Sequence, residues 1–334
     1  TKAGGNADGA ACLFTTTNMR PLSKFFLPLL LFLPLVTSCS DDDDNDQQTE
    51  QNINRNDYSQ EPALQRLEFP KVKGGSSIVV IHSTNDQYGI NYSIEWDCQK
   101  KSQRWSCYQM HSGNAGGRNS RVVDGYLFDE DMPNHDINYV TNEYGETFDP
   151  FWSSGYDHGH ICPSADRKYS RDANRQTFFL TNMQPQRNIF NGGLWLKMEN
   201  KLTNTWWPKS TGDTLYVAKG GTIDSEDNII EYISNRQRSA TSRQGFIPVP
   251  KYFFMALLLK QYNKKKDKWD YKALAFWAEH LNEDHSNDPL GNYVINIREL
   301  ERRTGIDFFC NLPDKIEEDV ETTTVEDIKW LWNL

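Results

Sequence analysis

The 334-residue sequence predicts an α+β (mixed α/β) fold with a central, mostly antiparallel sheet flanked by helices. Two observations support this prediction. Short apolar runs typical of strands lie on both sides of one central helical region and do not alternate with helices along the chain. The 21 Gly and 14 Pro, spread without a repeat, exclude collagen-like and low-complexity classes, and the length is sufficient for a large hydrophobic core.

The expected strands fall into two groups. In the first, residues 78–82 form a β-branched run, and residues 92–96 and 105–110 flank a polar turn and predict a hairpin. The second group follows the helical region and comprises residues 215–218, 246–249, 252–259, 271–277 and 293–295.

Helices are fewer than strands. Within residues 191–206, Leu194, Met198 and Leu202 recur every four positions, which predicts one apolar helical stripe. Residues 297–304 predict a second helix, since Asn296 can cap its start and Gly305 stands just after its end. Residues 175–178 are expected to end a short helix.

The N-terminal segment has the pattern of an export signal. Met19 is followed by Arg20 and Lys24 and then by the apolar run 25–36, which is shorter than the roughly 20 residues of a membrane span. The sequence Val-Thr-Ser-Cys ending at Cys39 is similar to a lipoprotein cleavage site. We therefore expect an exported protein, lipid-anchored through Cys39 at the outer membrane surface or on the periplasmic face.

The formal net charge of −10 is concentrated at two places. Residues 39–61 carry eight acidic side chains and one arginine, and residues 313–334 carry seven acidic side chains and two lysines. The predicted organisation is a signal region with its upstream residues (1–38), an acidic flexible tether (39–61), a main domain (62–312) and an acidic tail (313–334). The main domain is neutral overall, so the net charge does not exclude a polyanionic substrate.

Export permits disulfide bonds. Cysteines 98, 107, 162 and 310 belong to the main domain and allow three pairings, which the sequence does not rank.

Two histidines are the first candidate catalytic residues. His158 and His160 are two positions apart, so in an extended segment both side chains point to the same side. The unperturbed pKa of histidine lies near neutrality, which suits a general base. Taken alone, the pair is equally compatible with hydrogen-bonded surface histidines.

Asn191, Trp195 and Glu199 lie on one stripe of the expected helix. Positions eight apart are separated by about 12 Å along a helix axis, so Asn191 and Glu199 cannot both bind one ion directly. One could bind the ion while the other holds its water, and Mg²⁺ keeps several waters. In isolation, Asn191 could equally cap a helix and Glu199 could lie on a solvated face.

Basic residues surround these candidates. Clustered arginines in a neutral domain suggest contacts with phosphates, although surface solvation alone explains most arginines individually. They are Arg118, Arg121, Arg167, Arg171, Arg175, Arg187, Arg236, Arg238 and Arg243.

Three blocks of sequence together resemble the DNA/RNA non-specific endonuclease family. They are Asp157-His158-Gly159-His160, then Thr181-Asn182-Met183-Gln184-Pro185-Gln186, then Asn191 with Trp195 and Glu199 at steps of four. The resemblance extends over about residues 65–312. It implies a ββα-metal active-site motif and hydrolysis of DNA and RNA with Mg²⁺ or Mn²⁺ as cofactor.

The resemblance also implies roles for individual residues. His160 would activate the attacking water, Asn191 would be the direct protein ligand of the metal, and Glu199 would orient the waters of that ion. Asn182 and Gln186 would brace the site and its contacts with substrate. DNA and RNA would be the substrates. The lipid attached to Cys39 would anchor the protein to the membrane, and the sequence does not indicate the oligomeric state.

The sequence departs from the family pattern at His158, where members carry arginine. A charged hydrogen bond to phosphate is worth about 1.5–3 kcal/mol, so the departure predicts reduced activity or replacement by another arginine. Arg121 and Arg167 are the candidates. The alternative is a catalytically weakened nucleic-acid-binding surface lipoprotein. A zinc hydrolase built on the two histidines is less favoured, because Cys162 and Pro163 stand where further ligands are expected.

Overall fold

The computed structural model describes residues 51–121, 125–133, 149–233 and 247–334. The predicted signal, Cys39, and the arginines at 236, 238 and 243 lie outside these ranges. Within them, no helix combines the length and the apolar character needed to cross a bilayer.

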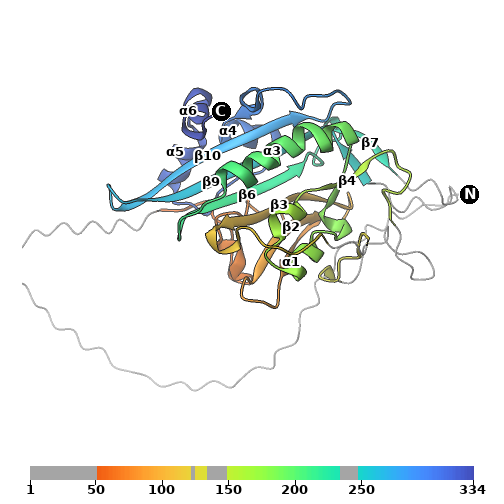
Figure 1. Ribbon diagram of the computed structural model, residues 1–334, viewed down its shortest axis with the longest axis horizontal. Coiled ribbons are helices and arrows are strands. Elements are labelled where there is room, and N and C mark those ends of the chain that lie inside the picture. Colours follow the sequence, from red (N-terminus) through yellow and green to blue (C-terminus); the bar gives the residue numbers. More distant parts are fainter. Residues whose placement is uncertain (1–50, 122–124, 134–148, 234–246) are drawn as a thin grey trace, which may run out of the picture.

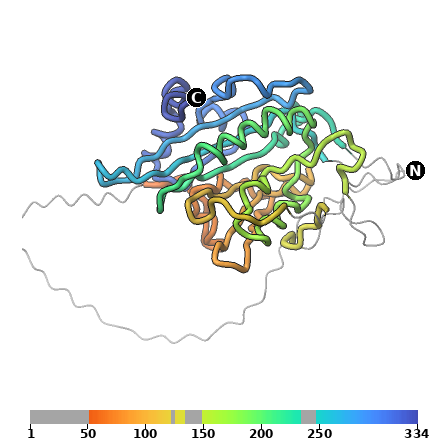
Figure 2. The backbone as a smooth tube through the Cα atoms, in the orientation of Figure 1, coloured from red at the N-terminus to blue at the C-terminus, as the bar shows by residue number. Residues whose placement is uncertain are grey.

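A seven-stranded sheet forms the centre of the described structure, and each pair of neighbouring strands is antiparallel. Figure 1 shows these strands stacked side by side, and Figure 2 traces the chain from the first strands to the last. In spatial order they are β1 (Ser77–Ser83), β2 (Ile90–Asp97), β3 (Ser102–His111), β6 (Thr214–Gly221), β9 (Tyr252–Asn263), β10 (Lys268–Glu279) and β11 (Val294–Ile295). The prediction of an antiparallel sheet with flanking helices is confirmed.

Two short ribbons lie outside this sheet. Strand β4 (Asp157–His160) pairs with β5 (Met183–Gln186), and β7 (Ile229–Ile233) pairs with β8 (Ile247–Pro250). The strands expected at 78–82, 92–96, 105–110, 215–218, 246–249, 252–259, 271–277 and 293–295 are all present, most of them longer than expected.

Strand β9 explains why the sheet is buried on both faces. Successive side chains of a strand point to opposite faces. Phe253, Met255 and Leu257 belong to one hydrophobic cluster, whereas Phe254 and Ala256 belong to a second cluster on the other face. A strand covered on both sides needs a continuous apolar run, and β9 has one.

One long helical segment covers the first face. It consists of α2 (Asn188–Phe190), the wide π turn η6 (Asn191–Trp195), α3 (Leu196–Lys201) and a second π turn η7 (Leu202–Trp206). The predicted stripe of Leu194, Met198 and Leu202 is buried in the first cluster. Figure 1 shows α3 in front of the sheet, running roughly along its strands. The prediction of a helix here is confirmed, with its start three residues earlier.

Helix α4 (Ile297–Thr304) contributes to the second face. The Asn296 side chain accepts a hydrogen bond from the Glu299 N–H (2.9 Å), and Gly305 ends the helix with a φ of 67°. Both end signals predicted from the sequence are therefore present. The remaining helical elements include η1 (Pro62–Gln65), η2 (Ser112–Asn114), η4 (Ser164–Arg167), α1 (Arg171–Gln176), η5 (Leu180–Asn182), η8 (Glu226–Asn228) and η9 (Leu290–Tyr293).

The structure differs from the predicted acidic tail. Within residues 313–334 it has two helices, α5 (Asp314–Glu321) and α6 (Val325–Trp332). The Ile328 and Trp332 side chains of α6 join the first hydrophobic cluster, and the Trp332 ring packs edge-on against Trp206. Because these apolar side chains pack in the core, the segment belongs to the folded domain. The many acidic residues around them made the apolar pattern hard to recognise in the sequence.

The tether also ends earlier than expected, because residues 51–56 pack on the domain. The Asn52 side chain donates to the Cys310 carbonyl (3.0 Å), and the buried Asn56 side chain donates to the Pro70 carbonyl (3.1 Å). The two ends of the described domain are thus joined by hydrogen bonds.

Cys107, Cys162 and Cys310 are free thiols in buried positions. None of the three two-disulfide pairings considered for the domain therefore forms. Burial raises the pKa of the Cys162 thiol to about 11, so it is uncharged near neutral pH.

The contact between the long helix and the sheet predicts where a core mutation is most costly. Phe253 is fully buried, and its ring lies 5.4 Å from Trp195 and 5.3 Å from Phe190. Phe253→Ala should lower the free energy of unfolding by about 3–5 kcal/mol, measured by urea denaturation. Tyr262→Ala, at the exposed end of the same strand, should cost at most about 1 kcal/mol. Equal losses for the two variants would contradict this account of the core.

Candidate active site

The β4–β5 ribbon and the long helix that follows it form a ββα unit beside a cleft of about 420 Å³. The cleft brings together five of the predicted site residues, Arg121, His158, His160, Asn191 and Glu199. The other residues that line it are Tyr126, Tyr156, Asp157, Pro163, Ser164, Ala165, Gly192 and Leu196.

The His160 imidazole has one ring nitrogen bound and one without a partner. Nδ1 lies 3.2 Å from the His158 carbonyl oxygen, which can only accept, so Nδ1 carries the proton of the neutral ring. Nε2 has no hydrogen-bond partner among the described residues. Burial, together with the smaller effect of the nearby Arg121 charge, lowers the pKa of His160 to about 3. The ring is therefore neutral near pH 7, with a lone pair on Nε2.

Asp157 orients Asn191. The Asp157 Oδ2 atom accepts hydrogen bonds from the side-chain nitrogens of Asn191 (3.0 Å) and Asn188 (3.1 Å). With its nitrogen held in this way, Asn191 accepts no hydrogen bond at Oδ1 from the residues that the structure describes. Asn191 is also not the N-cap of the long helix, because its own N–H donates to the Arg187 carbonyl (2.8 Å) inside the helix.

The π turn of the long helix starts at Asn191. The Leu196 N–H donates to the Asn191 carbonyl five residues back, so this turn holds more residues than an α-helical turn. In a straight α-helix, residues eight apart point about 80° apart around the axis. The wider turn brings Glu199 closer to the side of the helix on which Asn191 lies, and both residues line the cleft.

Glu199 is held by a lysine that the sequence analysis did not single out. The Lys219 ammonium donates to Glu199 Oε1 (2.6 Å), and the lysine side chain is completely buried. Burial raises the pKa of the Glu199 carboxyl, and the Lys219 charge opposes that rise.

His158 is enclosed by other side chains. Its ring stacks on Tyr126, with centroids 3.4 Å apart, and lies 4.8 Å from the Phe151 ring. Its Nε2 atom lies 2.9 Å from both carboxylate oxygens of Asp149. Where the resemblance implies an arginine, the chain thus has a ring that packs against aromatic residues and faces a carboxylate.

The two candidate phosphate-binding arginines occupy different environments. Arg121 is exposed, lines the cleft and lies over the Phe178 ring (4.9 Å). Arg167 is fully buried, lies over the Tyr108 ring (4.3 Å) and is absent from the cleft lining. Of the two, only Arg121 is placed to meet a ligand in the cleft.

Asn182 and Gln186 are buried beneath the site. The Asn182 amide exchanges hydrogen bonds with the Cys162 backbone (2.8 and 2.9 Å), next to the end of β4. The Gln186 side chain packs against Gly159. Neither residue lines the cleft, so both are placed to support the site from below.

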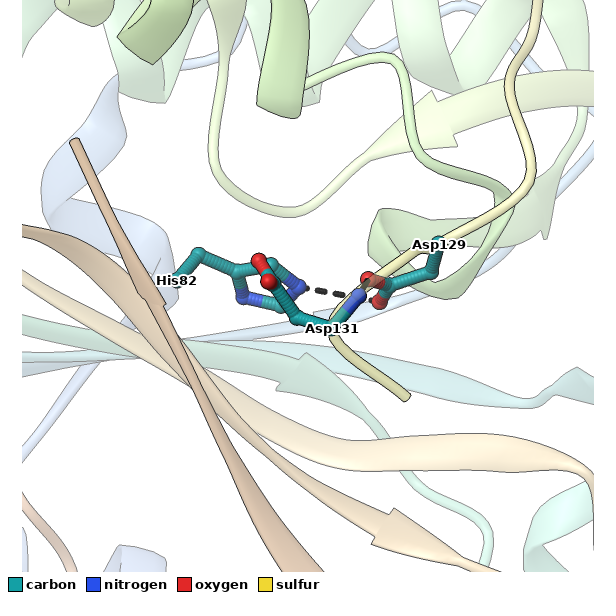
Figure 3. A group of neighbouring side chains, drawn as sticks. All are labelled: His82, Asp129 and Asp131. Atoms are coloured by element: carbon teal, nitrogen blue, oxygen red, sulfur yellow. Dashed lines mark hydrogen bonds and ion pairs between the residues drawn. The ribbon is translucent and has the colours of Figure 1, made fainter. Parts of the chain in front are cut away.

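A His–Asp–Asp group also lies outside the cleft lining. The potential ligand atoms of His82, Asp129 and Asp131 lie within 4.8 Å of one another, a spacing that could hold a metal ion (Figure 3). However, the Asp129 carboxylate already has partners in the His82 ring (2.9 Å), the Asp131 N–H (3.0 Å) and the Thr181 hydroxyl. These contacts anchor the segment that carries Tyr126, the residue stacked on His158.

The sequence model of the DNA/RNA non-specific endonucleases matches residues 76–315. The chain belongs to this family. It is therefore a nuclease, an enzyme that hydrolyses phosphodiester bonds, and the resemblance inferred from the three sequence blocks is confirmed.

Known nucleases are similar to this chain in sequence and in fold. A nuclease of Nostoc sp. is 25% identical over 234 residues, covering 69% of this chain and 75% of the relative. A mitochondrial nuclease of Saccharomyces cerevisiae is 26% identical over 270 residues, covering 73% and 77%. The fold is similar to that of a chain in a solved EndoG/EndoGI complex, with a TM-score of 0.51, 18% identity and coverage of 72% and 89%.

Sequence reasoning did not identify three supporting residues, Asp157, Tyr126 and Lys219. Asp157 carried a signal, because it opens the Asp-His-Gly-His block, three residues before the candidate base. The sequence signal for Lys219 was weaker: it directly follows a predicted buried strand, where a lysine requires a partner. No sequence signal pointed to Tyr126, because its stacking on His158 depends on the tertiary fold.

The β4–β5 pairing explains the glycine between the two histidines. A Cβ atom at Gly159 would lie 2.4 Å from Gln186 Cδ and 2.6 Å from the Gln184 carbonyl oxygen. Gly159→Ala should therefore force the strands apart, cost about 1–3 kcal/mol of stability and reduce nuclease activity at least tenfold. Thermal unfolding and plasmid nicking measure the two effects. Gly291→Ala, where a Cβ would meet its nearest atom at 3.6 Å, should leave both unchanged.

Proposed function

We propose that this protein is a sugar-non-specific endonuclease that cleaves DNA and RNA at the cleft and depends on Mg²⁺ or Mn²⁺. One observation carries the proposal: His160, whose Nε2 has no partner, and Asn191, whose amide nitrogen is held by Asp157, line the same cleft. A phosphodiester in this cleft would lie beside both a base and an oxygen ligand. Recognition of phosphate and sugar, without contacts to base edges, accounts for the lack of sequence preference.

In the proposed reaction, His160 Nε2 removes a proton from a water molecule as the water oxygen attacks phosphorus. The bond from phosphorus to the 3′ oxygen breaks, the departing oxygen takes a proton from solvent, and the new end carries a 5′-phosphate. The Nδ1–H of His160 remains bonded to the His158 carbonyl, which keeps the ring in the required tautomer. The low pKa of His160 keeps Nε2 unprotonated before substrate binds.

The residues of the cleft fit a hard divalent cation. Carboxamide and carboxylate oxygens are the ligands that Mg²⁺ prefers, and it retains several waters when few protein ligands are available. Asn191 would hold the ion through Oδ1, and Glu199 would orient its waters. When bound, the cation would supply positive charge at the phosphate and at the departing oxygen.

Arg121 is proposed to bind the substrate phosphate in place of the family arginine at position 158. Its guanidinium is exposed at the cleft, whereas the His158 Nε2 atom faces Asp149. The permanent charge and forked donors of arginine suit phosphate. The positive charge that binds the phosphate would thus come from the segment around Arg121 and not from β4.

Export and lipid attachment at Cys39 are proposed from the sequence pattern of residues 19–39. A surface or periplasmic anchor would place the cleft where nucleic acid from outside the cell can reach it. The direct test is whether intact cells digest added DNA, and whether Cys39→Ala abolishes lipid labelling.

The proposed roles of His160 and the metal can be tested together. His160→Ala should reduce plasmid nicking and RNA cleavage at least a hundredfold, because it removes the proposed general base. EDTA should abolish activity of the wild-type protein, and Mg²⁺ or Mn²⁺ should restore it. His111→Ala, a histidine outside the cleft lining, serves as control. DNA binding without cleavage by the wild-type protein between pH 5 and 9 would instead support the non-catalytic alternative.

Arg121→Ala should lower kcat/KM about tenfold to a hundredfold, which corresponds to the loss of one charged hydrogen bond of about 1.5–3 kcal/mol. The salt dependence of DNA binding should also become less steep, since one phosphate contact is lost. Arg118→Ala is the matched control, because Arg118 is exposed on the same segment but absent from the cleft lining. Equal effects of the two substitutions would mean that Arg121 contributes only general charge.

A further inference from the structure

A completely buried lysine reaches the active site from the central sheet. Lys219 lies on β6, where its backbone pairs with Ser106 of β3 on one side and Met255 of β9 on the other. Its side chain is fully buried and its ammonium donates to Glu199 Oε1 at 2.6 Å. Glu199, by contrast, is 14% exposed and lines the cleft.

The surroundings of Lys219 explain how the sheet holds a buried ammonium. Removing an unpaired ammonium from water costs several kcal/mol, so a buried lysine requires a partner. Besides the Glu199 carboxylate, the ammonium faces the rings of Trp195 (5.1 Å) and Tyr108 (5.9 Å). Aromatic rings attract cations through their faces, so these contacts add to the ion pair.

A second pair of charged residues, Asp166 and Arg167, contacts the same Tyr108 side chain as Lys219. Asp166 accepts hydrogen bonds from the Tyr108 hydroxyl (3.2 Å) and the Thr203 hydroxyl (2.8 Å), and Arg167 lies over the Tyr108 ring (4.3 Å). Together with Glu199 and Lys219, this gives two carboxylates and two cations in one buried region. The cluster is balanced, so loss of Lys219 would leave the Glu199 and Asp166 carboxylates with a single buried cation.

We propose that Lys219 is a positioning residue that holds Glu199 in the orientation required for catalysis. This inference rests on the proposed nuclease function of the cleft. Because the Lys219 side chain is completely buried and does not line the cleft, its contact with the site is the hydrogen bond to Glu199. The carboxylate is thereby fixed from two rigid elements, by the helix that carries it and by the middle of the sheet.

The test is a double-mutant cycle on the full domain. Lys219→Met retains most of the apolar volume and removes the ammonium. We expect it to lower kcat for plasmid and RNA cleavage about tenfold to a hundredfold, while KM and the salt dependence of DNA binding change less than twofold. Glu199→Gln should lower kcat at least as much. In the Glu199→Gln background, Lys219→Met should have little further effect, since the carboxylate that Lys219 positions is gone.

Lys201→Met is the matched control for loss of a lysine near the site. Lys201 lies on the same helix as Glu199, but its ammonium is directed to the Asn333 carbonyl (3.4 Å), and it does not line the cleft. This variant should keep wild-type kcat. Thermal unfolding of each variant checks folding, and if Lys219→Met fails to fold, Lys219→Gln, which retains a donor, replaces it in the cycle.

Three results would overturn the inference while leaving the nuclease function intact. The first is a folded Lys219 variant with wild-type kcat. The second is an effect of the Lys219 substitution that is equally large with and without Glu199→Gln, which would mean that the lysine acts independently. The third is a raised KM with a shallower salt dependence, which would indicate direct phosphate binding. Failure of the proposed function would appear differently, as absence of metal-dependent cleavage by the wild-type protein.

Discussion

The geometry of the active site depends on the link between a short ribbon and the start of a long helix. The Asp157 carboxylate, on β4, accepts hydrogen bonds from the side chains of Asn188 and Asn191. His160 lies at the other end of the same four-residue strand. The relative position of His160 and Asn191 therefore depends on the pairing of β4 with β5 and on hydrogen bonds to a charged acceptor, which are stronger than those between neutral groups.

Local patterns in the sequence predicted most of the scaffold. The apolar runs of β9 and β10, the stripe from Leu194 to Leu202 and the caps of α4 depend on side-chain periodicity and backbone conformation, which are local properties. The two C-terminal helices were missed because their acidic residues dominate the composition of that segment. The packing of Trp332 beneath the long helix depends on tertiary contacts that no local pattern contains.

For the active site, the identity of the residues could be predicted from the sequence, but their burial could not. The joint resemblance of three sequence blocks to one family identified His160, Asn191 and Glu199, and all three line the cleft. Burial was not predictable in the same way. Arg121 and Arg167 have the same chemistry in the sequence, yet one is exposed at the cleft and the other is enclosed in the core. The π turn at Asn191 likewise has no residue pattern that distinguishes it from an ordinary helical turn.

The joining of the two ends of the domain has a consequence for the timing of assembly. Asn52 bonds to the backbone at Cys310, and the last helix, α6, packs against Trp206 at the end of the helix that carries Asn191 and Glu199. A nascent chain lacks these contacts until residues 310–332 have left the ribosome. The helix that carries Asn191 and Glu199 therefore gains its packing against α6 only after that segment has been synthesised.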